Sequence, residues 1–563
     1  ILVGLTSGIA AIILKTVVFQ LHLLVKLTNT IYTQNYLYIL FPLAGILLTI
    51  FTIKFFLKDK FKKGSGQILF SIAKKSSIVD KHTTYTHLLT SAITVGLGGS
   101  AGLEAPIVVT GAAIGSNYGR INRMDYRERT LMLACGSAAG IAAIFNAPIA
   151  GIMFAVEIIL TEATLSAFVP LIISAVIGAL CSKVVLNEGI LLVFTLKQPF
   201  NYVNIPYYIL LGLLAGMISV YFASVTLKIE QLSKLFTNRF VKGLIGGLVI
   251  GLLVFLFPPL FGEGYSSILP LANLQPNSLL NDSLFYSFNN NEWFVLLFIS
   301  AICLIKVIAT SITLNFGGNG GNFAPSLFVG AYLGFAFSRF INLLNFARLP
   351  ESNFTLVGMA GILSGVMYAP LTGIFLIAEV TGGYELMIPL MIVSSISYGI
   401  VRVFEPYSMD TRELAKKGEI LTADKDKNIL TLLDIHGIIE NDFSKILYNK
   451  KIIDLTELIS HSKRNLFPVV DESDKLLGIV YMENIREILF ELNTFQDLAV
   501  VELMKSPPAM LQINEDMGSV MKKFDESKAW NLPVLKDDKY IGFISKSSVF
   551  SSYREQIIKS HSD

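Results

Sequence analysis

The chain has 563 residues, of which 53% are hydrophobic and only 15% charged, and its mean hydropathy is +0.60. This composition is too apolar for a soluble globular protein and indicates a membrane protein. The net charge of +3 is too small to indicate a strongly charged partner, and no nucleic-acid partner is expected.

Apolar runs recur from the first residue to about residue 406, and the longest approach the ~17–25 residues that a helix needs to span a bilayer. Shorter, glycine-rich runs lie at 107–114 and 325–337. Half-length helices are tolerated at membrane depth only where protein or a water-filled cavity surrounds them. The pattern therefore predicts a multi-pass protein with a transport pathway in the lipid bilayer. The longest runs are 39–56, 208–225, 241–256, 293–313 and 386–401.

Two connections between the apolar runs are strongly basic. Because basic loops tend to stay on the cytoplasmic side, both are predicted to be cytoplasmic. A solvated basic face explains these charges more simply than a lipid-specific site does. The residues are Lys54, Lys58, Lys60, Lys62, Lys63, Lys74, Lys75 and Lys81 in the first connection, and Arg120, Arg123, Arg127 and Arg129 in the second.

The polar motifs of common enzymes are not found in the sequence. Cys135, Cys181 and Cys303 lie in apolar segments and are interpreted as small buried side chains. The six histidines have no metal-ligand spacing, and there is no nucleophile elbow, zinc pattern or phosphate-binding glycine loop. We therefore expect no metal, no cofactor and no enzyme activity.

A short pattern occurs twice in the apolar part of the chain. Gly-Leu-Glu-Ala-Pro at 102–106 returns as Gly-Asn-Phe-Ala-Pro at 321–325, and Ala-Pro-Ile-Ala-Gly at 147–151 returns as Ala-Pro-Leu-Thr-Gly at 369–373. The offset between copies is nearly the same for both motifs (324 − 105 = 219 and 369 − 147 = 222). Duplicated, broken apolar helices indicate an ion site between repeats. Because a helix start offers free N–H groups, the expected ion is an anion.

The composition changes after residue 407, and 408–563 is charged throughout. Two similar pieces, 467–480 and 532–545, predict strand, turn, strand and then helix, at an offset typical of a repeat unit (533 − 468 = 65). The pattern resembles a tandem CBS pair, an α/β module that often binds adenine nucleotides. The carboxylate that holds a ribose in that family is missing from 481–484 and from 545–548. A structural or coupling role is therefore favoured, and nucleotide binding stays open.

Five motifs in the first part of the chain, in the correct order, resemble the CLC family of chloride channels and chloride/proton exchangers. They are Gly-Ser-Gly at 64–66, Gly-Leu-Glu-Ala-Pro at 102–106, Phe-Asn-Ala-Pro-Ile-Ala-Gly at 145–151, Gly-Asn-Phe-Ala-Pro at 321–325 and the isolated Tyr407. The resemblance implies an all-α polytopic membrane domain at 1–407, made of two inverted repeats with broken helices. It also implies a homodimer with one pore per subunit and a cytoplasmic CBS pair at 408–563.

Glu104 is the principal candidate for the gate. A lone carboxylate in an apolar, helix-starting motif is costly in a membrane and indicates function. The resemblance implies that ionised Glu104 occupies the outer anion site and swings away when protonated to admit chloride. Leu103 and Ala105 replace the arginine and second glycine that are usual there, which removes a positive charge from the outer entrance and restricts the backbone.

Ser65 is the first candidate chloride ligand. Its flanking glycines let the backbone approach an ion, and a hydroxyl binds an anion without a full charge, so that the anion can leave. The resemblance implies that the Ser65 and Tyr407 hydroxyls hold the central chloride, which favours chloride over fluoride or nitrate. An interfacial anchor is the ordinary alternative for Tyr407. The further expected chloride-binding residues are Gly64, Gly66, Leu103, Asn322, Phe323 and Ala324.

The residues that bear on proton coupling point to two mechanisms. Exchangers of the family often carry an inner proton-relay glutamate, and the corresponding position here is Ile158, next to Glu157. His87, in the apolar run before Glu104, stands where a lysine is usual, and a satisfied polar contact is its expected role. Because Glu104 is retained, proton-coupled exchange is the favoured interpretation. A passive chloride channel is the alternative, and a membrane-embedded sensor or scaffold is a minor one.

Overall fold

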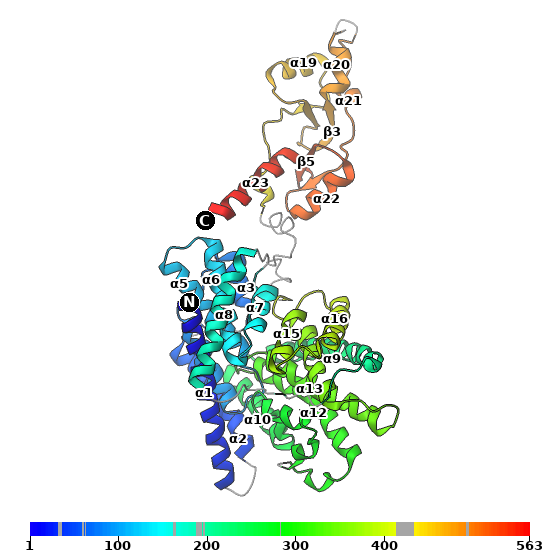
Figure 1. Cartoon of the computed structure of the whole chain (residues 1–563). Helices are drawn as coiled ribbons and strands as arrows, with labels where there is room; N and C mark the ends of the chain where they lie inside the picture. Colours follow the sequence, from blue (N-terminus) through cyan, green and yellow to red (C-terminus); the bar gives the residue numbers. More distant parts are fainter. Residues whose placement is uncertain are drawn as a thin grey trace. The chain divides into compact units, whose positions relative to one another are not determined.

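The computed structural model describes residues 1–31, 37–58, 61, 64–160, 165–186, 194, 198–281, 283–412, 433–490 and 495–562. The chain divides into two compact units, Ile1–Glu419 and Ile420–Asp563 (Figure 1). The boundary after residue 407 stays a prediction. Three of the basic residues, Lys60, Lys62 and Lys63, lie outside the described residues.

The first unit is helical. Within the described residues, nine helices are long and apolar enough to cross a membrane, so the chain is a multi-pass membrane protein. Its first half contains α1 (Leu2–Ile31), α2 (Leu37–Phe51), α3 (Gly66–Lys74), α4 (Thr83–Gly96), α5 (Glu104–Ile121), α6 (Tyr126–Phe145), α7 (Pro148–Phe154) and α8 (Leu165–Leu186). Its second half contains α9 (Ile205–Lys234), α10 (Arg239–Leu256), α11 (Tyr265–Ala272), α12 (Glu292–Asn315), α13 (Phe323–Leu343), α14 (Glu351–Met367), α15 (Pro370–Val380) and α16 (Met387–Phe404).

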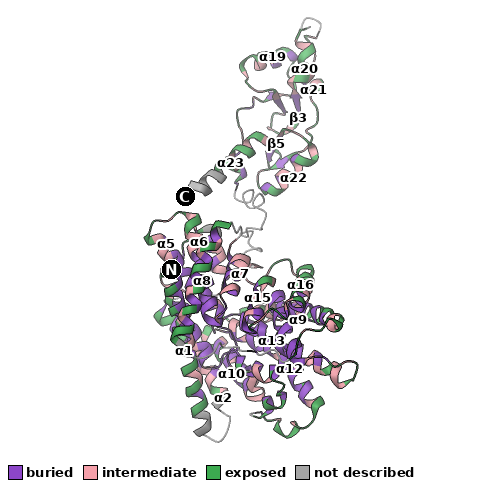
Figure 2. Ribbon diagram, viewed as in Figure 1, coloured by how far each residue is buried: buried purple, intermediate pink, exposed green. Residues whose placement is uncertain are grey.

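The distribution of buried residues separates central from peripheral helices (Figure 2). Helices α13 and α14 are buried along most of their lengths. Peripheral helices instead expose large apolar side chains, such as Val184, Leu213 and Leu248. Such exposure is costly in water, whereas in a bilayer these side chains meet lipid tails.

The duplication seen in the sequence extends to helix packing. Helices α5 and α6 touch at Gly111 and Gly136, where a Cβ on Gly111 would lie 2.2 Å from the Gly136 carbonyl oxygen. Helices α13 and α14 touch in the same way at Gly330 and Gly358, where the corresponding distance is 2.3 Å. The second pair follows the first at the offsets of the sequence motifs (330 − 111 = 219 and 358 − 136 = 222). Both halves therefore contain the same helix pair, held together by close backbone approach.

The two repeats also cap each other. Glu379, in α15, accepts hydrogen bonds from the Ile149 and Ala150 N–H groups at the start of α7, at 3.0 and 2.8 Å. Glu157 does the same for α15, where the Leu371 and Thr372 N–H groups donate to it, both at 2.8 Å. Each carboxylate satisfies N–H groups that a helix start leaves unpaired. The helix starts at 148 and 370 are consequently occupied by the protein's own carboxyl groups.

The second unit contains two three-stranded sheets of the same topology. In the first, β1 (Ile446–Leu447) pairs parallel with β2 (Leu466–Val470), which pairs antiparallel with β3 (Leu476–Tyr481). In the second, β4 (Leu511–Gln512), β5 (Asn531–Lys536) and β6 (Lys539–Ser545) repeat this order. The helices are α19 (Ile452–His461), α20 (Met482–Phe490), α21 (Val500–Leu503), α22 (Met517–Ser527) and α23 (Lys546–Ser562). The expected strand, turn, strand and helix order of both copies is confirmed.

Arg464 links the two copies of this unit through its ion pairs. Its guanidinium contacts Glu440 at 2.5 Å and Asp442 at 2.7 Å, and Ser545 of β6 donates to Glu440 at 2.5 Å. The hydrogen bond from Arg464 lowers the pKa of Asp442. Because a lowered pKa favours the ionised folded state, this contribution is present above about pH 4 and is lost as the pH falls through the lowered pKa.

The Arg464→Met variant is therefore expected to lower the free energy of unfolding of this unit by about 1 kcal/mol at neutral pH, and by less at acid pH. Hydrogen exchange of the segments around 440 and 543 in the full-length protein measures the effect. Lys451→Met, which removes the exposed pair with Asp497, is the control and should change exchange little. Equal effects of the two variants would contradict the role given to Arg464.

Candidate functional site

The starts of α5 and α13 meet at the centre of the first unit. Gly102 and Gly321 form an isolated antiparallel bridge, in which each N–H donates to the other residue's carbonyl at 2.9 Å. A Cβ on Gly102 would lie 2.2 Å from a Glu104 carboxylate oxygen, so the approach requires glycine. The bridge brings together two helix starts from different repeats and directs their partial positive charges toward one region.

The Glu104 carboxylate lies at this junction and is 1% exposed. One oxygen accepts the Ala324 N–H at the start of α13 at 3.3 Å, and the other accepts the Tyr265 hydroxyl at 2.5 Å. The Phe323 ring packs near Phe145, with ring centroids 5.5 Å apart. The Glu104 carboxylate thus lies at the start of α13, where a helix offers unpaired N–H groups.

Ser65 lies at the start of α3, where its side chain is buried. The carboxylate of the half-buried Asp410 interacts with the Ser65 side chain. The backbone of Asp410 is also close, because a Cβ on Gly66 would lie 2.5 Å from its carbonyl oxygen. Gly64, with φ of +82°, provides the turn before Ser65. The helix start at Ser65 therefore faces a second carboxylate of the protein.

Tyr407 follows α16, and its side chain is 41% exposed. Among the described residues, no hydrogen bond joins its hydroxyl to that of Ser65. The buried end of this segment is instead fixed by Tyr368, whose hydroxyl donates to the Glu405 carbonyl. The chloride-binding role of Tyr407 stays a prediction.

The second helix start has a further polar group. Asn322 is the N-cap residue of α13, and its Oδ1 has no hydrogen-bond partner in the described part of the chain. The donors that the sequence predicts here are the backbone N–H groups of Asn322, Phe323 and Ala324, which all lie at this helix start.

The inner relay position is apolar in the structure as well. Ile158 lies in a π-helical turn, Ala155–Ile159, and is half-buried. Its neighbour Glu157 is bound to the start of α15, so its carboxylate is used for capping. His87 contacts the Gln67 side chain at 2.8 Å, a polar contact of the kind expected for it. None of these three positions offers a carboxylate that is free of structural bonds.

The sequence interpretation missed several charged or hydroxyl groups near the site. They are Glu263, Tyr265, Lys306 and Asp410. A signal for two of them exists in Gly-Glu-Gly-Tyr at 262–265, because a carboxylate between glycines in an apolar segment indicates function. Lys306 precedes Phe323 by the same offset as His87 precedes Glu104 (323 − 306 = 104 − 87), so the repeat could also have revealed it.

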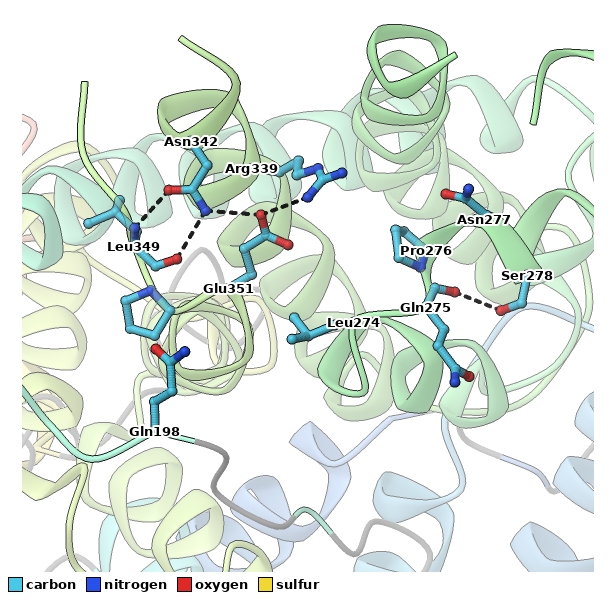
Figure 3. A pocket seen from close by; sticks show the side chains of 11 residues that line it. Gln198, Leu274, Gln275, Pro276, Asn277, Ser278, Arg339, Asn342, Leu349 and Glu351 are labelled. Carbon is cyan, nitrogen blue, oxygen red and sulfur yellow. Dashed lines mark hydrogen bonds and ion pairs between the residues drawn. The ribbon is translucent and has the colours of Figure 1, made fainter. Parts of the chain in front are cut away.

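A separate pocket of about 550 Å³ lies near the ends of α13 and α14 (Figure 3). Asn342 and Arg339 both bond the Glu351 carboxylate there, at 3.0 and 3.2 Å. Gln198 and Gln275 line it as well. None of the predicted site residues lines this pocket, so it is distinct from the junction at Glu104.

Two opposed helix starts around a buried carboxylate, within a set of membrane-spanning helices, define a membrane transport protein for anions. Residues 44–402 match the family described as voltage gated chloride channel, and the chain belongs to this family. Residues 438–491 and 500–555 match CBS domains. The resemblance to the CLC family and the predicted fold class are thereby confirmed.

Several relatives and solved structures are similar to the chain. The putative chloride channel protein ClcB-like of Ralstonia nicotianae is 30% identical over 391 residues, which cover 67% of this chain and 85% of the relative. Chloride channel protein CLC-f of Arabidopsis thaliana is 24% identical and covers 71% of this chain and 56% of the relative.

Among solved structures, a slow cyanobacterial Cl⁻/H⁺ antiporter has a TM-score of 0.63 at 23% identity, covering 74% of this chain and 96% of its own. A eukaryotic CLC transporter has a TM-score of 0.61 at 20% identity and covers 97% of this chain and 96% of its own. At these identities, the likeness establishes the fold.

Proposed function

We propose that the protein exchanges chloride for protons across a membrane, with Glu104 as the gate. The observation that carries the proposal is the Glu104 carboxylate at the start of α13, where it accepts the Ala324 N–H. A group that occupies an anion site with its own charge competes with a free anion. Proton binding removes that charge, so proton binding and chloride binding become linked through one carboxylate.

The transport step follows from this competition. While Glu104 is ionised, it holds the Ala324 N–H and excludes chloride from the start of α13. When Glu104 takes up a proton, it loses the charge that the helix start attracts, and chloride replaces it at the N–H groups of Asn322, Phe323 and Ala324. Ser65 supplies a hydroxyl farther along the path, and the Tyr407 hydroxyl is proposed to join it when the ion is bound.

A passive chloride channel is the second candidate, and one observation favours it. Ile158 cannot carry a proton, and the adjacent Glu157 is committed to the start of α15. Under this alternative, protons reach Glu104 from one side only and alter opening without being transported. The name of the Ralstonia relative as a putative chloride channel protein agrees with this candidate, whereas the name of the cyanobacterial antiporter agrees with exchange.

The assembly is proposed to be a homodimer with one pathway per subunit, and the CBS pair is proposed to lie in the cytoplasm.

The CBS pair is assigned a coupling role. In place of the ribose-binding carboxylate, the second copy has Ser548, whose N–H and hydroxyl bond Ser545. The first copy has Asn484, which accepts a hydrogen bond from Lys505 at 3.1 Å. Nucleotide binding therefore forms no part of the proposal.

The test is proton movement in liposomes that contain the purified protein under a chloride gradient, with valinomycin and potassium to clamp the voltage. Exchange predicts that protons move against their own gradient while chloride moves down its gradient. Rapid chloride flux without proton movement would establish the channel. A folded protein that moves neither ion would favour the sensor or scaffold.

Asp410→Asn is expected to increase the apparent affinity for chloride from the inner side by about fivefold. An Asp410 carboxylate close to the Ser65 hydroxyl repels an anion there, and asparagine removes that charge at nearly the same size. Chloride efflux measured at a series of inner chloride concentrations tests this expectation.

The exposed Asp80→Asn variant is the matched control and should leave the affinity unchanged. An Asp410→Asn protein with the affinity of the wild type would show that chloride does not bind near Ser65, or that Asp410 moves away before it does.

A further inference from the structure

The segment between α10 and α11 presents another carboxylate near Glu104. Glu263 stands between Gly262 and Gly264, whose φ angles are +59° and +89°. Because glycine adopts such angles without strain, the backbone can turn on both sides of Glu263 and carry it inward. The Glu263 side chain is 9% exposed, and its Oε1 has no hydrogen-bond partner in the part of the chain that the structure describes.

Two helices hold this segment in place. Lys306 of α12 is fully buried, and its Nζ donates to the Gly262 carbonyl at 3.0 Å. The His22 ring of α1 packs edge-on against Phe261, with ring centroids 5.3 Å apart. Because the backbone on the N-terminal side of Glu263 is fixed from two directions, the position of its carboxylate is set by the fold.

The carboxylate of Glu263 belongs to a buried group of charges. The Glu104 and Glu263 carboxylates both interact with the Leu103 backbone, just before α5, and with each other. Two like charges this close repel each other, and a proton on either of them relieves the repulsion. The titratable groups that face Glu263 are Glu104 of α5, Tyr265 of α11, Lys15 of α1 and Lys306 of α12.

The side of the membrane on which Glu263 is expected follows from the direction of α5. Helix α5 runs from Glu104 toward Arg120, and the basic residues at that end are predicted to be cytoplasmic. Leu103 precedes the opposite end of the helix. Because Glu263 interacts with Leu103 at that end, we expect it on the outer side of Glu104.

We propose that Glu263 carries protons between the outer solution and Glu104, an inference that rests on the exchange function proposed above. In the inward step, the carboxylic acid of Glu263 gives its proton to the carboxylate of Glu104, and ionised Glu263 then takes a proton from the outer water. The unpaired Oε1 is the position where that proton binds. Lys15 and Lys306 balance the negative charge of Glu263 between the two transfers.

The test compares Glu263→Gln with the wild type in liposomes that contain the full-length protein. Proton and chloride movement are recorded while the outer pH and the inner pH are varied separately. Glutamine keeps the shape of the side chain but cannot carry a proton. We expect proton movement about tenfold slower and without its dependence on outer pH, while its dependence on inner pH persists. Glu263→Asp should restore both the rate and the dependence on outer pH in part.

The control is Glu292→Gln, which removes an exposed carboxylate at the start of α12 and should behave as the wild type. If Glu263→Gln does not fold, the double variant Glu263→Gln with Lys306→Gln removes both opposite charges and makes the same comparison. A glutamine variant with the wild-type rate and outer-pH dependence would overturn the role of Glu263 and leave exchange intact. A wild-type protein that moves chloride without protons would overturn both.

Discussion

Glu104→Gln is expected to abolish chloride-driven proton movement and to make chloride flux independent of pH. Glutamine resembles the protonated side chain, so it cannot compete with an anion for the Ala324 N–H by charge. Without an ionisable group at this helix start, proton binding no longer alters access of chloride. The ratio of protons to chloride should fall by at least about tenfold, which simultaneous proton and chloride recordings would show.

Tyr265→Phe provides a matched comparison for this variant. It removes the hydroxyl that bonds Glu104 at 2.5 Å and keeps the ring and the carboxylate. This protein should retain coupling, with a changed dependence on pH. Proton movement that continues at the wild-type ratio in Glu104→Gln would contradict the assignment of Glu104 as the group that links the two ions.

Gly330→Ala is expected to destabilise the first unit by about 2–3 kcal/mol. A Cβ at this position would lie 2.3 Å from the backbone oxygen of Gly358, and backbone cannot move aside as a flexible side chain can. The helices α13 and α14 would have to separate, which would also displace the Ala324 N–H at the start of α13. Thermal unfolding of the purified protein should show a midpoint lower by about 5 °C.

Gly399→Ala, in α16, is the control for that substitution. Its Cβ would meet open space, and alanine favours a helix over glycine by about 1 kcal/mol. The control should therefore unfold at the wild-type temperature or slightly above it. Equal midpoints for Gly330→Ala and Gly399→Ala would show that the contact between α13 and α14 can widen at little cost.

The duplicated motifs predicted the site more fully than they predicted its neighbours. The position of Glu104 and the donors at Ala324 follow from local pattern, because a helix start determines where its N–H groups point. Glu263 and Asp410 were missed, since each comes near the site only through tertiary contacts with Leu103 and Ser65. Sequence spacing alone does not encode which distant loop reaches a helix start.

The partners of Glu157 and Glu379 illustrate the same limit. Both glutamates end repeated motifs at matching positions, and the repeat is visible in the sequence. Each glutamate caps a helix of the other repeat, and this depends on how the two repeats face each other in three dimensions. An apolar sequence with one glutamate per copy is equally compatible with a carboxylate that serves its own repeat.

The exchange of caps between repeats constrains how the protein is made. The start of α7 cannot be capped until Glu379 is synthesised, 230 residues after Ile149. At about 5–20 residues per second, the ribosome needs about 10–50 s to supply it. During that interval the N–H groups of α7 have no carboxylate in a setting where unpaired groups are costly. The first repeat therefore inserts incomplete and acquires its final form only when the second repeat arrives, which makes this interval the period of greatest exposure to quality control.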